Sequence, residues 1–108
     1  MPGSDIITGT LDILILKAVS WGPEHGYGIG KWIRQNTGDN VIVQEGVLYP
    51  ALHRLERKGL LLEKWGQSDG GRAAKFYTLS AAGRKHLVAE AKRWTNVARS
   101  VTYALGRT

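Results

Sequence analysis

Residues Glu45–Glu56, with the sequence EGVLYPALHRLE, contain the pattern that decides the fold. Apolar residues recur three and four positions apart, which is the spacing of one face of an α-helix. The pattern predicts a helix over residues 46–58, ended by Gly59 in a left-handed conformation. Its inner face is expected to hold Val47, Leu48, Ala51, Leu52 and Leu55. Pro50 is expected in the first turn, where its missing N–H costs little.

The outer face of this helix suits a polyanion. It holds Gly46, Tyr49, Pro50, His53 and Arg57, with Arg54 at its flank. No carboxylate lies on that face, because Glu56 falls to one side. The major groove of DNA presents acceptors and phosphates, so this residue set favours DNA binding. The alternative is an ordinary solvated helix face.

Another helix is expected nearer the N-terminus, over residues 10–20, with Thr8 or Thr10 as N-cap. One face of this helix carries Leu11, Leu14, Ile15, Ala18 and Val19. Ile13 and Leu16 fall off that face, so the apolar surface is too wide for a single contact. We therefore expect this helix to be covered on two sides, with a second subunit as one candidate.

A second helix and a hairpin flank the quoted stretch. The helix is expected to start near Gly26 and to end in a turn at residues 36–40, with Ile29, Trp32 and Ile33 pointing inward. After the quoted stretch the period changes, and residues 60–65 and 72–79 read as two strands. The Gly-rich turn at residues 67–71 joins them into a hairpin.

The last helix is expected from Ala81 to about Leu105, with Ser80 as N-cap. Its apolar residues are spaced alternately four and three apart: Leu87, Ala91, Trp94, Ala98, Val101 and Leu105. This is the a/d spacing of a coiled coil, so these residues are predicted to form a homodimer interface. Two alanines make the seam weak alone, so the wide apolar surface of the first helix of the other subunit, with Leu11, is expected to complete it.

The order of these elements predicts a mainly α (α+β) fold. It is a winged helix-turn-helix with a two-stranded wing and a long C-terminal helix. Residues 1–80 are expected to form the DNA-binding domain and residues 81–108 the dimerisation helix. The third helix then takes the position of the recognition helix. Arg72 and Lys75, beside the glycines of the hairpin turn, are expected to reach phosphate or a minor groove; a plain turn with solvated charges is the alternative.

Charge supports a nucleic-acid partner. The 108 residues carry a net charge of +6. Residues 1–45 hold three basic and five acidic groups, whereas residues 46–108 hold twelve and four. A basic half of a small domain is typical of proteins that bind a polyanion.

The composition also excludes several kinds of site. Cysteine is absent, which excludes disulfides and thiolate ligands and is compatible with the cytoplasm. The three histidines are too scattered to predict a metal site, and no signal peptide or membrane span is visible. Residues 26–30, GYGIG, lack the strand and the Lys-Ser/Thr pair of a phosphate loop. No cofactor and no catalytic group are therefore expected.

Three motifs resemble the PadR family of transcriptional regulators. Residues 45–56 resemble its recognition helix, His25-Gly26-Tyr27 the start of its second helix, and residues 71–84 its wing and the entry to its last helix. The resemblance implies a dimeric DNA-binding regulator, usually a repressor, that releases DNA when a small, often aromatic, molecule binds. It also adds Tyr27 to the DNA-contacting residues. Val47 replaces a frequent Ser or Thr, and Ala74 replaces a frequently basic wing residue.

The expected operator is an inverted repeat with two major grooves about 34–36 Å apart. Tyr49, Pro50 and His53 should touch base edges, and the cations Arg54, Arg57, Arg72 and Lys75 should mostly hold phosphate. The alternative function is a winged-helix module that binds protein without specific DNA binding.

Trp94 has two interpretations. With Ala91 and Ala98 on either side, its ring either fills a close helix–helix contact or walls a slot for a planar aromatic ligand. In the second case Tyr103 is the other candidate for the wall.

Overall fold

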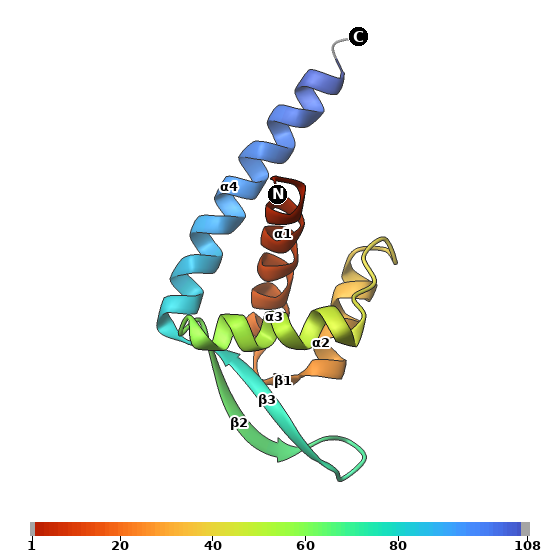
Figure 1. The fold of residues 1–108 in the computed structure, drawn as a ribbon, viewed down its shortest axis with the longest axis vertical. Coiled ribbons are helices and arrows are strands. Elements are labelled where there is room, and N and C mark those ends of the chain that lie inside the picture. The colour runs from red at the N-terminus through yellow and green to blue at the C-terminus, as the bar shows by residue number, and fades with distance from the viewer. Residues whose placement is uncertain (1, 107–108) are drawn as a thin grey trace.

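A computed structural model describes the backbone of residues 2–106 and the side chains of residues 9–106. Its elements are α1 (Pro2–Ala18), a 3-10 turn (Val19–Trp21), β1 (Glu24–His25), α2 (Gly26–Asn36), α3 (Glu45–Arg57), β2 (Leu61–Gln67), β3 (Ala73–Leu79) and α4 (Ala81–Leu105). Figure 1 shows α3 crossing the lower end of α1, with β2 and β3 extending below it as a wing. The α4 helix rises beside α1 and continues past it, so the molecule measures 54 × 28 × 27 Å. The predicted winged helix-turn-helix with a long last helix is confirmed.

The sheet has three antiparallel strands in the order β1-β3-β2. In the wing, Leu61 pairs with Leu79 and Gln67 with Ala73. β1 adds the pair Glu24 and Tyr77 on the other side of β3. The sequence predicted two strands and missed β1, because two residues are too few to show an alternating pattern.

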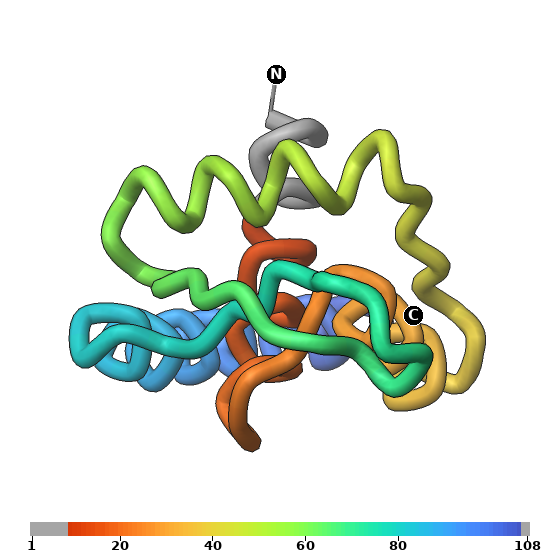
Figure 2. Tube along the Cα trace, turned by 90° about the horizontal axis from the view of Figure 1, so that it is seen from below, coloured from red at the N-terminus to blue at the C-terminus, as the bar shows by residue number. Residues whose placement is uncertain are grey.

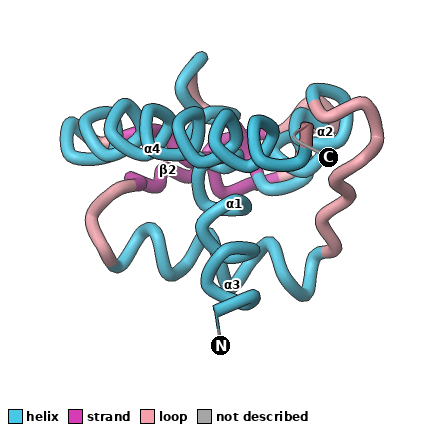
Figure 3. Tube along the Cα trace, turned by 90° about the horizontal axis from the view of Figure 1, so that it is seen from above, coloured by secondary structure: helices cyan, strands magenta, loops and turns pink. Residues whose placement is uncertain are grey.

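The core lies where α1, α2, α3 and the sheet meet. Its fully buried side chains include Ile15, Leu16, Ile29, Ile33, Leu52, Leu55 and Leu61. Figures 2 and 3 show α1 between α3 and α4, so its wide apolar surface is covered within its own chain. The expectation that this helix is covered on two sides is confirmed, with Leu16 fully buried, and the cover comes from its own chain. Val47 is misplaced by the prediction, since it is 57% exposed on α3 rather than in the core.

Two helix starts differ from the prediction. α1 begins at Pro2, so Thr8 and Thr10 lie inside the helix and neither is its N-cap; the side chain of Thr8 is outside the described residues. α3 begins at Glu45, which places Pro50 in its second turn rather than its first. The carbonyl of Gly46, four residues back, then receives no hydrogen bond from position 50.

Side-chain caps fix the starts of α2 and α4. His25 Nδ1 accepts a hydrogen bond from the Gly28 N–H (3.0 Å). Ser80 Oγ accepts from the Gly83 N–H (2.9 Å), as predicted, and donates to the Gly59 carbonyl (2.6 Å). Gly59 has φ +76°, the left-handed end that the sequence predicted for α3. Among the helices that the structure describes, none combines the length and the apolar character needed to cross a membrane.

Candidate nucleic-acid interface

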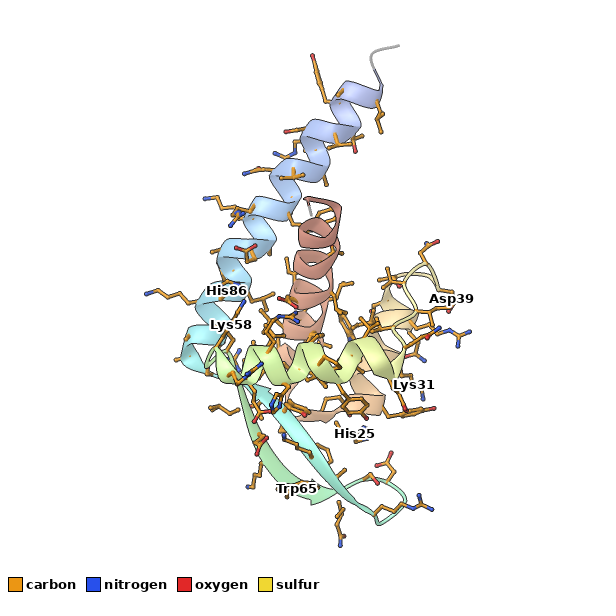
Figure 4. All side chains as sticks on the ribbon, in the orientation of Figure 1. His25, Lys31, Asp39, Lys58, Trp65 and His86 are labelled. Carbon is orange, nitrogen blue, oxygen red and sulfur yellow. The ribbon has the colours of Figure 1, made fainter. Side chains whose placement is uncertain are left out.

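A groove of about 1070 Å³ separates α3 from the wing. Its walls include six of the nine residues predicted to contact DNA: Tyr27, Tyr49, Pro50, His53, Arg72 and Lys75. Figure 4 shows His25 beneath α3 and Trp65 on the wing, on either side of this space. We call it the α3–wing groove. The fold thus brings together residues that are up to 48 positions apart in the sequence, from Tyr27 to Lys75.

Large aromatic side chains stand exposed around this groove. Tyr27 is 73% exposed, Tyr49 46% and Trp65 66%. Exposed aromatic rings beside polar groups are typical of a surface that a partner covers. Trp65 was not among the predicted contacts. The signal that could have found it is its place in the predicted hairpin, where it lies opposite the predicted contact Lys75.

Tyr49 lies against the backbone of α2. A Cβ placed on Gly26 would come within 2.8 Å of the Tyr49 ring. Gly26 therefore allows the close approach that sets the position of this ring.

Gly26→Ala is expected to leave the fold intact, because the distal atoms of Tyr49 can move away. Since Tyr49 then leaves its place in the groove, affinity for the operator should fall by roughly tenfold, or about 1.4 kcal/mol. The measurement is a gel-shift or anisotropy titration. Gly30→Ala on the same helix is the control, because its Cβ would meet only Leu48 at an ordinary 3.7 Å. Equal affinities for the two variants would contradict this role of Gly26.

The two predicted wing cations have different surroundings. Arg72 is exposed next to Gly71, which has φ +78° and permits the tight turn. Lys75 Nζ lies 3.2 Å from Glu56 Oε1 of α3 and forms a closer, hydrogen-bonded ion pair with Glu63 of β2. The bond to Glu63 raises the pKa of the Lys75 ammonium. Of these two cations, Arg72 presents its charge to solvent and Lys75 does not.

The cations of α3 also differ. Arg57 is exposed at the end of the helix. Arg54 instead forms a hydrogen-bonded ion pair with Asp12 of α1, and its Nε is buried without a hydrogen-bond partner. Arg54 does not line the α3–wing groove. Sequence spacing placed it at the flank, but it could not show a carboxylate 42 residues away.

Burial raises the pKa of the Asp12 carboxyl, and this effect outweighs the lowering by Arg54. The folded protein therefore binds this proton more tightly than the unfolded chain does. Ionised Asp12 therefore lowers the free energy of unfolding at pH values above the pKa that its carboxyl has in the folded protein. This cost disappears as the pH falls towards the pKa of the same carboxyl in the unfolded chain.

Asp12→Asn should therefore change how the free energy of unfolding depends on pH below neutrality. The unfolding free energy of the native protein, relative to this variant, should rise as the pH drops from 7 towards 4. Urea unfolding at several pH values measures it. A difference that stays constant or shrinks on acidification would contradict the direction of the shift.

A second hollow, of about 610 Å³, lies where α2 meets the start of α3. Tyr27, Gly46 and Tyr49 line it together with Lys31 and Arg34, two cations that the sequence analysis missed. Figure 4 shows Lys31 beside the start of α3. Lys31 follows Tyr27 by four residues, one helical turn, and this spacing was the available signal. Arg34 bonds to Asp39 (3.0 Å), whereas Lys31 is exposed.

The predicted dimer residues divide into two groups. Leu11 and Leu87 are partly buried against the core of their own chain. Trp94, Val101 and Leu105 are 46%, 51% and 72% exposed, Ala91 is exposed and Ala98 half-buried. The second half of α4 thus leaves an apolar stripe uncovered in this chain. Residues 107 and 108 of the predicted dimerisation segment lie outside the described residues.

Trp94 also contacts its own α1, since its Nε1 donates to Thr10 Oγ1 (3.3 Å). Tyr103 is nine residues further along α4. At about 100° and 1.5 Å per residue, it lies on the opposite side of the helix and about 13 Å away. The two proposed pocket residues therefore do not face one another within one chain.

Comparison with known proteins identifies relatives of this arrangement. Residues 15–89 match the model of the transcriptional regulator PadR-like family. An uncharacterised protein of Lysinibacillus sphaericus is 35% identical over 98 residues, which cover 90% of this chain and 89% of that protein. The structure of a transcriptional regulator from Clostridium thermocellum is similar with a TM-score of 0.80 at 28% identity, over 93% of this chain and 94% of that one. Bacillus subtilis PadR in complex with operator DNA shares the fold, with a TM-score of 0.66 at 24% identity over 74% of this chain and 45% of that one.

Proposed function

Because the chain belongs to the PadR-like family of transcriptional regulators, we propose that it is a cytoplasmic repressor that binds an inverted-repeat operator as a homodimer. The observation that carries the proposal is the α3–wing groove, where Tyr27, Tyr49 and His53 stand together beside the exposed cation Arg72. Bacillus subtilis PadR, which shares the fold, forms a complex with operator DNA, and this supports a DNA-binding role.

Within this proposal the contacts have two roles. Tyr49, Pro50 and His53 form the part of α3 that enters the major groove and touches base edges. Gly46 has open space above its Cα, which allows the backbone to approach the DNA. Arg57 and Arg72 hold phosphate or line the minor groove, and Lys31 beside Tyr27 contacts the backbone from α2. Arg54 supports α3 from behind through Asp12.

His53→Ala and Arg57→Ala test this division. His53→Ala should change which bases are preferred, at a cost of about 1–3 kcal/mol on the cognate site. Arg57→Ala should weaken binding to all sequences alike and reduce the salt slope of log K by about one. Anisotropy titrations on operator and random duplexes, at several salt concentrations, measure both effects. Identical behaviour of the two variants on both duplexes would contradict the division.

The exposed stripe of α4 supports the homodimer. Trp94, Val101 and Leu105 repeat at the a/d spacing and keep 46%, 51% and 72% of their surface exposed among the described residues. Pairing two copies through this stripe would bury it and would place two α3 helices on one face of DNA. The spacing of those helices then controls affinity.

Regulation follows from this spacing. A ligand that favours a different spacing lowers DNA affinity by its differential affinity for the two states. We propose a small aromatic effector, with a slot between the two Trp94 rings as its site. The alternative is that the rings pack closely and leave no slot, and substitution of Trp94 by Ala distinguishes the two arrangements.

A further inference from the structure

The lysine of the wing uses its charge inside the protein. Lys75 of β3 lies opposite Trp65 of β2, so Glu63 is its diagonal neighbour on the same face of the wing. Its Nζ bonds to Glu63 and lies 3.2 Å from Glu56 Oε1 of α3. One ammonium group therefore joins the two strands of the wing to the candidate recognition helix.

Lys75, Glu56 and Glu63 form a cluster whose burial is more typical of a structural ion pair than of charges on the open surface. The side chains of Lys75 and Glu56 are 28% and 20% exposed. Lys75 Nζ also lies 5.5 Å from the centre of the Tyr77 ring, and Tyr77 is buried. The bridge thus rests on the edge of the core, where an ion pair is less screened than on the open surface.

The charges of the cluster argue against a phosphate contact. Two carboxylates and one ammonium sum to one negative charge. If Lys75 turned towards a phosphate, it would leave Glu56 and Glu63 without their cation and close to DNA. The two carboxylates and the DNA phosphates are all negative and would repel one another. Moving Lys75 from the carboxylates to a phosphate is therefore unfavourable.

We propose that Lys75 is a positioning residue that holds the wing at a fixed distance from α3, in place of the phosphate contact that the sequence suggested. This inference rests on the proposed DNA-binding function. A two-stranded hairpin is flexible by itself. If the wing is already fixed in the free protein, operator binding does not have to order it, and the entropy lost on binding is smaller. Arg72, at the tip, then reaches DNA from a wing already in place.

Three variants of the full chain test the proposal. Lys75→Met keeps most of the side-chain stem and removes the charge. Arg72→Met removes the exposed cation of the tip. Lys64→Met is the matched control, because Lys64 is an exposed lysine paired with Phe76, on the other face of the wing. Two measurements are made: hydrogen exchange of the β2 and β3 amides without DNA, and operator affinity as a function of salt.

Lys75→Met should raise exchange of the wing amides by roughly tenfold and lower operator affinity by roughly tenfold, with the salt slope unchanged. Arg72→Met should leave exchange unchanged and reduce the salt slope by about one. Lys64→Met should leave exchange unchanged. The proposal is overturned if Lys75→Met reduces the salt slope by about one, or if it leaves wing exchange unchanged.

Glu56→Gln is a test in which simple electrostatics and the proposed bridge predict opposite changes in operator affinity. It removes a negative charge near DNA, so simple electrostatics favours tighter binding. Loss of the bridge to α3 should instead increase wing exchange and weaken operator binding, and tighter operator binding would overturn the proposal. A native protein that binds no duplex would contradict the proposed function, whereas the exchange measurements would still test the bridge.

Discussion

Gly83→Ala is expected to destabilise the fold by about 3 kcal/mol, at the upper end of the cost of overpacking. A Cβ at position 83 would lie 2.1 Å from the Leu60 carbonyl oxygen and 3.1 Å from Leu79 Cδ2. The first of these is a backbone atom, so it cannot turn aside as a side chain can. The start of α4 would have to move away from the chain between α3 and the wing.

That movement would break a connected set of hydrogen bonds. Ser80 Oγ bonds both to the Gly59 carbonyl and to the Gly83 N–H, and the Ser80 N–H bonds to the Leu60 carbonyl (3.2 Å). The junction therefore fixes the end of α3 relative to the start of α4. Because α3 is the candidate recognition helix, the variant should also lose operator affinity at temperatures where it remains folded.

Urea unfolding followed by circular dichroism measures the loss of stability. Gly46→Ala is the matched control, since a Cβ there meets nothing within 4 Å. That variant should be neutral or gain up to about 1 kcal/mol from helix propensity. A Gly83→Ala protein as stable as the Gly46→Ala protein would show that the junction relaxes freely, contrary to this expectation.

The helices could be predicted because each shows its own period. Leu48, Leu52 and Leu55 identify the buried face of α3, and Gly59 identifies its end. The apolar surface of α1 is wider than one face, and this width predicted cover on two sides. It could not identify the neighbours, because α3 and α4 come from distant parts of the chain.

Six of the nine predicted contacts line the α3–wing groove, and those on α3 followed from the sequence for a similar reason. The outer face of α3 is the complement of its inner face, so Tyr49 and His53 could be placed. The roles of Arg54 and Lys75 could not, because their partners come from other elements. Asp12 is 42 residues from Arg54, and Glu56 is on a different element from Lys75. Charge type predicted an affinity for phosphate, whereas the folded partners decide which cations remain available.

Trp94 is the residue on which the homodimer proposal depends most. Its indole contacts Thr10 of its own chain and keeps 46% of its surface exposed. Ala91 and Ala98, one turn away on either side, are small enough to let a second helix approach. The exposed half of the ring is then the largest apolar surface near the middle of the α4 stripe.

Trp94→Ala is expected to weaken the dimer by about 3–5 kcal/mol, the cost of truncating a buried aromatic side chain. This corresponds to at least about a hundredfold rise in the dimer dissociation constant. Sedimentation equilibrium across micromolar concentrations measures it. Trp21→Ala is the matched control, because Trp21 is 71% exposed next to Lys17 and lies outside the α4 stripe. That variant should dimerise as the native protein does.

The same variant decides between close packing and a ligand slot. If the rings pack, the Trp94→Ala dimer dissociates, operator binding falls with it, and planar aromatic compounds do not quench the tryptophan fluorescence of the native protein. If the two rings wall a slot, the dimer and its operator binding survive, while release of DNA by planar aromatic compounds is lost. A native chain that sediments as a monomer would contradict both arrangements, because each requires two copies of α4 to meet at Trp94.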